Sequence, residues 1–266
     1  MRTIMLILTA ATLLLTACDN LFYYPSRQIY TTDPGMPFED ISIPSASGHD
    51  LHGWYFPVTD PKGLVVFFHG NARNLTAQYR GFAWVTKAGY DYMIFDYSGY
   101  GRTRGKANRR AVHLDGIAAL TWAVAKKKER GYPLILIGQS LGGAVLSASL
   151  IDHPERAEAD FILLDCTFAS YKSVAAYHFS GGHRLVSDDY AAKGRLAALD
   201  GIPKLITHCR QDETVPFFLG EELYAEAGEP KWFWEFDCGH SKAFWRKETQ
   251  DRFLAFAGKE ISRRKR

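Results

Sequence analysis

Runs of hydrophobic residues recur along the chain at the spacing of a layered α/β protein. Uninterrupted runs are typical of strands buried on both faces, and four of them occur at residues 64–68, 92–95, 134–137 and 161–164. Short apolar segments on either side of a Ser-Gly-His-Asp turn predict a hairpin of residues 41–43 and 51–56. Two later segments, 204–207 and 232–236, complete a predicted set of eight strands.

Helical patterns separate the later strands. One stretch begins after a capping residue, Asn108, and stops at Gly131, followed by Pro133. Positions within it follow the helical repeat: Leu114, Ile117, Thr121 and Val124. Because strands alternate with helices, the pattern predicts an α/β fold with a mostly parallel sheet and helices on both faces.

The remaining segments define the domain organisation. Residues 166–203 lie between two predicted strands, are rich in aromatic residues, and are too short for an independent lid domain. We therefore expect a small helical cap there. Residues 18–36 are rich in turn formers and predict a tether, so the folded domain is expected to span residues 37–266.

Composition narrows the class of protein. The chain has 266 residues, of which 47% are hydrophobic, so it is long enough for one large domain and is neither disordered nor collagenous. A formal net charge of +3 is too small to indicate any particular partner, and no nucleic-acid partner is expected. The basic run at residues 263–266 is interpreted as a solvated tail. A second basic stretch is either a solvated loop or a site for phosphate headgroups: Arg102, Arg104, Lys106, Arg109 and Arg110.

The first residues resemble an export signal. Residues 3–17 carry no charge, and they are too few to cross a membrane, which takes about 20 residues. The segment ends in Leu-Thr-Ala before Cys18, which resembles the bacterial lipobox. That resemblance implies removal of residues 1–17, lipid on Cys18 and an exported, membrane-anchored domain. Asp19 is similar to the signal that retains some lipoproteins at the inner membrane, facing the periplasm, although the sequence leaves the choice of membrane open.

A strong candidate for chemistry lies at the end of a predicted buried strand. Residues 138–142 read Gly-Gln-Ser-Leu-Gly, which matches G-x-S-x-G between a strand and a small-residue helix start. A sharp turn there would expose the oxygen of Ser140 at the carboxyl edge of the sheet. The adjoining helix N-terminus would favour developing negative charge. Ser140 is therefore predicted to be a nucleophile.

A serine nucleophile needs a base and an acid that orients the base. In proteins with this motif the chain order is serine, acid, histidine. His240 follows the last predicted strand and is the candidate base. Asp212, after the seventh strand, is the preferred acid, and Asp165, at the end of the sixth, is the alternative.

An oxyanion hole requires backbone N–H groups near the serine. Residues 69–72 follow the third strand, where this arrangement supplies one N–H group. We therefore predict that Asn71 and Leu141 provide the two donors. His69 is interpreted as a structural residue that braces the loop.

These motifs together resemble the α/β-hydrolase superfamily, in particular the α/β-hydrolase domain-containing proteins, some of which remove palmitoyl groups from proteins. The serine-aminopeptidase-type and acyl-hydrolase families are also similar. The resemblance rests on residues 68–74, 96–101, 138–143, 212–216 and 239–240. It departs at Cys209, where the family usually has glycine, and at Ser98, where arginine is common.

The resemblance implies a serine hydrolase that needs no metal or cofactor. Its substrate would be a small acyl compound or an acylated lipid or protein, with an ester or thioester bond preferred over an amide. A hydrolase-fold binding lipoprotein without turnover is the other class of function left open.

Three cysteines follow the predicted signal: Cys166, Cys209 and Cys238. An odd count leaves at least one free thiol. Cys209 and Cys238 are expected at the carboxyl ends of neighbouring strands, where a disulfide between them is possible.

Overall fold

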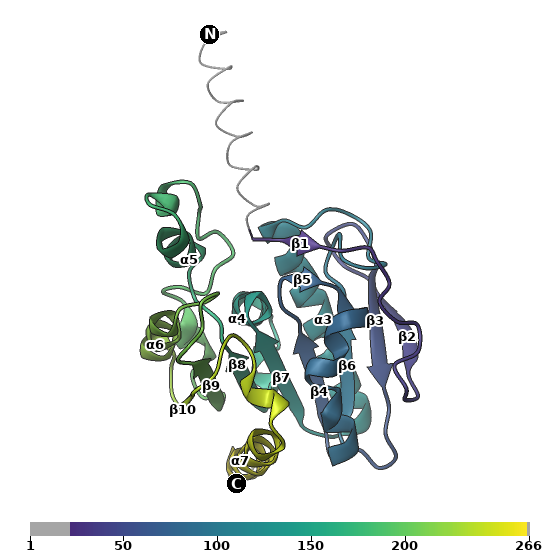
Figure 1. Cartoon of the computed structure of the whole chain (residues 1–266). Helices are drawn as coiled ribbons and strands as arrows, with labels where there is room; N and C mark the ends of the chain where they lie inside the picture. The colour runs from purple at the N-terminus through teal and green to yellow at the C-terminus, as the bar shows by residue number, and fades with distance from the viewer. Residues whose placement is uncertain (1–21, 265–266) are drawn as a thin grey trace.

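The computed structural model describes residues 22–264, and an eight-stranded sheet runs through its centre (Figure 1). The strand order is β10-β9-β8-β7-β4-β6-β3-β2, and every strand except β3 runs in the same direction. The strands are β2 (Glu39–Ile43), β3 (Leu51–Phe56), β4 (Leu64–Phe68), β6 (Asp91–Phe95), β7 (Leu134–Gln139), β8 (Phe161–Asp165), β9 (Lys204–Cys209) and β10 (Lys231–Phe236). The predicted eight-stranded, mostly parallel sheet is confirmed.

Helices cover both faces of the sheet, as the alternating pattern predicts. One face packs against α3 (Arg109–Arg130), α4 (Leu141–Asp152) and α6 (Phe217–Glu226). The other packs against α2 (Leu75–Gln78), η2 (Tyr79–Gly81), η3 (Ala83–Ala88) and α7 (Lys247–Arg264). Two short 3₁₀ turns, η4 (Arg156–Glu158) and η7 (Ala243–Trp245), complete the connections between these layers.

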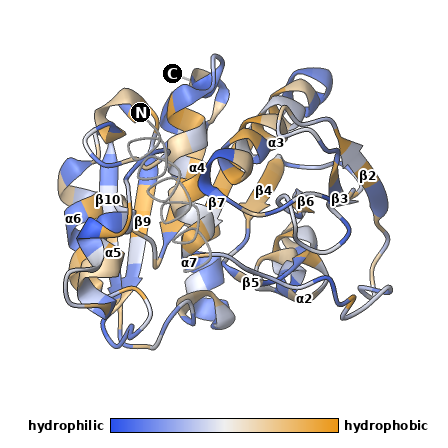
Figure 2. Ribbon diagram, turned by 90° about the horizontal axis from the view of Figure 1, so that it is seen from above, coloured by the Kyte–Doolittle hydropathy of each residue, from blue (hydrophilic) through white to orange (hydrophobic). Residues whose placement is uncertain are grey.

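Strand β4 shows why the central strands are continuously apolar. Leu64, Val66 and Phe68 belong to the core on the α3 and α4 side, whereas Val65 and Phe67 belong to the core on the α7 side. All five side chains are fully buried. Burial of each such side chain stabilises the fold by about 1.5–3 kcal/mol. Figure 2 shows the hydrophobic residues concentrated in the central strands and in α4.

Helix α3 begins and ends at the residues that the sequence indicates. The side-chain oxygen of Asn108 accepts a hydrogen bond from the backbone N–H of Ala111 at 2.9 Å. Gly131 ends the helix with a φ of 70°, a left-handed conformation that glycine adopts without strain. Local capping and burial therefore favour the same helix.

The segment predicted to form a cap, residues 166–203, contains α5 (Tyr171–His178), η5 (Gly182–Arg184) and η6 (Leu196–Leu199). Helix α5 lies beyond the carboxyl edge of the sheet, as Figure 1 shows. Its N-terminus is capped by the hydroxyl of Ser170, which accepts a hydrogen bond from the N–H of Ser173.

Part of the predicted tether lies on the surface of the domain. Strand β1 (Tyr24–Pro25) pairs with β5 (Ala72–Arg73), directly after the loop predicted to form the oxyanion hole. The side-chain amide of Asn74 donates hydrogen bonds to the backbone oxygens of Ser26 and Gln28. We call residues 22–30 the strap. Residues 1–21, which include the predicted signal, Cys18 and Asp19, lie outside the described residues.

Arg263 and Arg264, at the start of the predicted solvated tail, are exposed to solvent as expected but do not form a free tail. Both belong to α7. Arg264 donates to the backbone oxygens of Ala157 and Ala159, and Arg263 pairs with Glu260 at 2.8 Å. The pair of Arg263 is local to the helix, whereas Arg264 reaches partners that lie close to it only in the folded chain. Within residues 22–264, no helix combines the length and the apolar character needed to cross a membrane.

Candidate active site

Ser140 lies at a strained turn between β7 and α4. Its backbone has φ 54° and ψ −127°, which is rare for a residue with a side chain. The N–H of Ser140 donates to the backbone oxygen of Asp165 at 2.9 Å, and the hydroxyl of Thr167 donates to the backbone oxygen of Ser140 at 2.6 Å. Such a conformation costs about 1–3 kcal/mol and persists where the surroundings impose it, as these two bonds do.

The glycines of the motif are required by close packing at this turn. A Cβ atom on Gly142 would lie 2.0 Å from the backbone oxygen of Phe68 in β4. A Cβ atom on Gly138 would lie 2.5 Å from the Cα of Gly143. Glycine at both positions therefore lets the helix start directly behind the serine.

Ser140, His240 and Asp212 form one hydrogen-bonded chain. The Nε2 atom of His240 lies 3.0 Å from the Oγ atom of Ser140. Its Nδ1 atom lies 2.6 Å from the Oδ2 atom of Asp212. Asp212 and Ser140 are buried, and His240 is partly exposed. An imidazole held in this way can take the proton of the serine hydroxyl while the carboxylate stabilises the resulting cation.

The surroundings of Asp212 favour its charged form. Burial raises the pKa of this carboxyl, but the hydrogen bond and charge of His240 and the N–H of Val215 lower it by more. The pKa therefore lies below its ordinary value. The Oδ1 atom also accepts a hydrogen bond from the N–H of Thr214 at 2.9 Å, so both carboxylate oxygens are fixed.

Asp165, the alternative acid, has other partners. Its carboxylate accepts hydrogen bonds from the side-chain amide of Gln139 at 2.9 Å and from the hydroxyl of Thr207 at 2.8 Å. Burial raises the pKa of Asp165 above its ordinary value despite these bonds. Of the two acids left open by the sequence, Asp212 is therefore the one hydrogen-bonded to the imidazole of His240.

A disulfide joins the two loops that carry the acid and the histidine. Cys209 ends β9, Cys238 follows β10, and their Cα atoms are 5.1 Å apart. The backbone reinforces this link, because the N–H of Gln211 donates to the oxygen of Cys238 at 3.1 Å. The possible pairing is thus present, and Cys166 is buried as a free thiol. The cross-link fixes the base of each loop within three residues of Asp212 and His240.

The loop after β4 is braced from several sides. The side-chain oxygen of Asn71 accepts hydrogen bonds from the N–H of Tyr24 in the strap and from the hydroxyl of Tyr100. The amide of Gln78 bonds both to the N–H and to the oxygen of Gly70. Tyr24 and Gln78 lie outside the sequence motifs, and the motif at residues 96–101 contains Tyr100 without indicating that its hydroxyl reaches Asn71.

His69 is buried beneath this loop, as the structural interpretation expects. Its Nδ1 atom lies 2.8 Å from the backbone oxygen of Gly70, and burial lowers its pKa. Tyr97 packs against its ring and donates to its backbone oxygen. An uncharged imidazole in this position braces the loop and does not reach Ser140 through any hydrogen bond among the described residues.

The predicted oxyanion donors lie beside the serine. Leu141 is the first residue of α4, and with Asn71 it borders a cavity that Ser140 also lines. Among residues 22–264, neither backbone N–H group of this pair makes a hydrogen bond. Two free N–H groups at a helix N-terminus and a facing loop can bind developing negative charge.

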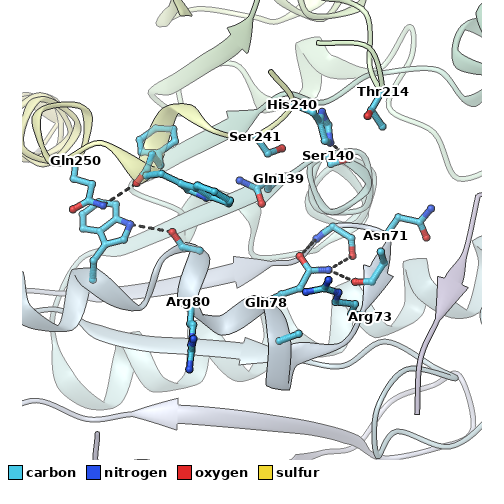
Figure 3. Close-up of a pocket in the computed structure, with 17 residues that line it drawn as sticks. Asn71, Arg73, Gln78, Arg80, Gln139, Ser140, Thr214, His240, Ser241 and Gln250 are labelled. Carbon is cyan, nitrogen blue, oxygen red and sulfur yellow. Dashed lines mark hydrogen bonds between the residues drawn. The ribbon is translucent and has the colours of Figure 1, made fainter. Parts of the chain in front are cut away.

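Two cavities meet at Ser140. The smaller, of about 480 Å³, is mainly apolar and lies under α5, where Phe22, Leu141, Phe168, Val174 and Phe179 line it. The larger, of about 780 Å³, contains polar and aromatic side chains and is drawn in Figure 3. His240 borders the larger cavity. The residues of the basic stretch at 102–110 line neither cavity.

One group of side chains has metal-ligating atoms close together. Atoms of Cys166, His208 and Asp212 lie within 4.8 Å of one another. Each already has a partner: the sulfur of Cys166 accepts from the N–H of Ser241, His208 bonds to the oxygen of Val215, and Asp212 holds His240. Burial also raises the pKa of the Cys166 thiol far above its usual range. This group is therefore poorly suited to a cation.

Known proteins provide an independent comparison. Residues 59–179 match the family model described as serine aminopeptidase, S33. Protein YfhR of Salmonella typhi is 32% identical over 225 residues, which cover 80% of this chain and 77% of that protein. The lysophosphatidylserine lipase ABHD12 of Macaca fascicularis is 26% identical over 76% of this chain and 57% of its own length.

A solved structure shows the same fold. The esterase Pf2001 of Pyrococcus furiosus superposes with a TM-score of 0.69 at 19% identity, over 91% of this chain and 97% of that one. At this identity the likeness concerns the fold. Together with the close match to YfhR, it means that the chain belongs to the α/β-hydrolase superfamily, in one family with the YfhR proteins.

Proposed function

We propose that the protein is a serine hydrolase that cleaves acyl esters or thioesters through an acyl-enzyme intermediate. The observation that carries this proposal is the continuous hydrogen-bonded chain from Ser140 through His240 to Asp212, open to two cavities. A binding protein without turnover has no need for this geometry. A hydrolase activity also agrees with the membership of the superfamily.

The proposed reaction has two halves. The Oγ atom of Ser140 bonds to the acyl carbon while His240 takes the hydroxyl proton, and the N–H groups of Asn71 and Leu141 hold the oxyanion. His240 then returns the proton to the leaving oxygen or sulfur as that bond breaks. Water, deprotonated by the same histidine, attacks the acyl-enzyme and releases the acid and the free serine.

The smaller cavity is the proposed acyl site. Leu141, one of the proposed oxyanion donors, lines this cavity and not the larger one, and the walls of the smaller cavity are mainly hydrocarbon and aromatic. Its volume of about 480 Å³ is within the range of small-molecule sites. Apolar burial of an acyl chain against Phe168, Val174 and Phe179 would contribute most of the binding energy.

The name of the matching family model favours amide hydrolysis as a second candidate. An aminopeptidase must hold the ammonium group of its substrate, for which a carboxylate is the usual partner. Of the described residues that line the two cavities, none is Asp or Glu, and two are arginines, Arg73 and Arg80. The absence of a carboxylate among these lining residues therefore favours ester and thioester hydrolysis over aminopeptidase activity.

The proposed site of action is a bacterial membrane surface. The uncharged run of residues 3–17 before Cys18 motivates a lipid anchor, with the domain on the exported side. A single acyl chain binds a membrane only marginally, whereas several hold it stably. Phe22, four residues after Cys18, lines the smaller cavity, so an anchor on Cys18 would hold that cavity close to membrane-borne acyl substrates.

Ser140→Ala should lower the rate of p-nitrophenyl octanoate hydrolysis by a factor of roughly 10³ or more and leave the thermal melting curve unchanged. The variant should also lose covalent labelling by a fluorophosphonate. Ser262→Ala, an exposed serine in α7, is the matched control and should retain both. Labelling that persists without Ser140 would exclude it as the nucleophile, and faster hydrolysis of octanoyl anilide than of the ester would favour the amidase.

Asp212→Asn should lower kcat on the same ester by about 10⁴-fold, because the amide no longer holds the correct imidazole tautomer. Asp165→Asn should lower kcat far less, since Asp165 bonds to Gln139 and Thr207. Steady-state kinetics with melting curves for both variants measure this difference. The opposite ranking would make Asp165 the acid.

Cys18→Ser should release the protein from the membrane fraction or leave the precursor uncut, because the lipid attachment site is lost. Cell fractionation with intact-mass measurement tests this, and Ser140→Ala serves as an anchored, inactive control. A Cys18→Ser protein that is processed and fractionates like the parent would refute the anchor and leave the proposed hydrolase intact.

A further inference from the structure

The two cavities at Ser140 border different parts of the reacting centre. His240 lines the larger cavity, together with Ser241, whereas Leu141 lines the smaller. In an acyl transfer the histidine must reach the leaving atom to return its proton. If Ser140 acts as proposed above, on which this inference rests, the leaving group therefore occupies the larger cavity.

The larger cavity carries positive charge without compensation. Arg73 and Arg80 line it, and no Asp or Glu is among its described lining residues. Neither guanidinium forms an ion pair with a described carboxylate. Figure 3 shows Arg73, Gln78 and Arg80 on the wall across from His240, with the guanidinium of Arg80 extending away from Ser140. In this view Arg73 lies nearer to Ser140 than Arg80 does.

The backbone at Arg73 is held in an unusual conformation. Its φ is 68°, which is uncommon for a residue with a long side chain. The strap imposes this geometry, because β1 pairs with β5 and the N–H of Ser26 donates to the oxygen of Arg73 at 3.1 Å. The guanidinium also lies over the ring of Tyr30, 5.6 Å from its centre. Backbone conformations of this kind are found frequently at active sites and ligand-binding positions.

We propose that the larger cavity binds an anionic leaving group, so that the preferred substrates are acyl esters of an alcohol carrying a phosphate or a carboxylate. Arg73 would hold the anion beside the loop of Gly70 and Asn71. Arg80, farther from Ser140, would add to the positive electrostatic potential of the larger cavity. Guanidinium groups bind phosphate and carboxylate oxygens through charge-assisted, bidentate hydrogen bonds. The acyl chain would extend in the opposite direction, into the apolar cavity under α5.

The test compares three soluble substrates with one acyl chain: monooctanoylglycerol, octanoylglycerol phosphate and the octanoyl ester of lactate. The full-length protein should show a kcat/KM at least about threefold higher for one or both anionic esters than for the neutral one. Arg73→Gln should lower this ratio by about three- to tenfold, and Arg80→Gln by less, because Arg80 lies farther from Ser140. The anionic ester that loses its advantage in Arg73→Gln shows whether the cavity binds a phosphate or a carboxylate.

Two measurements separate recognition from a general loss of structure or charge. Thermal melting curves of both arginine variants should match that of the parent, so that a lower ratio reports recognition and not unfolding. Arg104→Gln removes the same charge from an exposed loop outside the cavity and should leave the ratio unchanged.

Equal rates on all three esters would overturn this proposal, as would an anionic preference that survives in the double variant Arg73→Gln/Arg80→Gln. Either result would leave the proposed hydrolase activity standing. A protein that hydrolyses none of the three esters and resists fluorophosphonate would instead refute the proposed function.

Discussion

The backbone of Ser140 is the constraint on which the site depends. A residue with a side chain adopts φ 54° between β7 and α4 because the neighbouring chain leaves no other path. Gly142 lies against the oxygen of Phe68, and Thr167 and Asp165 bond to the serine backbone. The buried parallel sheet supplies the rigid support, since β4, β7 and β8 are fully covered on both faces. The stability of the core thus maintains a locally unfavourable turn that exposes the hydroxyl.

The loops around this turn are fixed by links between distant parts of the chain. The disulfide of Cys209 with Cys238 ties the acid loop to the histidine loop. On the opposite side, Tyr24 bonds to Asn71, so the strap sets the position of one proposed oxyanion donor. Preorganised donors and a preorganised base lower the reorganisation needed during the reaction, which is how electrostatic stabilisation is obtained. The strap therefore serves the proposed anchor and the proposed site at once.

Much of this could be predicted from the sequence, for physical reasons. The buried strands contain continuous apolar runs, and the motif around Ser140 follows one of them directly, so fold and nucleophile position are local signals. His240 and Asp212 could be chosen as candidate base and acid because both follow strands, and the carboxyl ends of parallel strands meet at one edge of the sheet. The choice between Asp212 and Asp165 depends on side-chain partners, and Gln139 and Thr207 have no sequence signature as the hydrogen-bond donors of Asp165.

Other features depend on contacts that a linear pattern does not contain. The short pairing of β1 with β5 involves two residues on each strand, too few to give a periodic signal. The bonds of Arg264 to Ala157 and Ala159 form only when α7 packs beside β8, so a basic terminal run resembled a free tail. The division of the site into a charged and an apolar cavity likewise arises from side chains far apart in sequence.

If Ser140 is the nucleophile, it carries the acyl group of the substrate during turnover. Rapid acid quenching of the full-length protein during turnover of p-nitrophenyl octanoate, followed by peptide mass spectrometry, tests it most directly. An octanoyl adduct should appear on the peptide that contains Ser140, formed and lost at rates that match turnover. Turnover with no adduct on that peptide, or with the adduct on another residue, would contradict it.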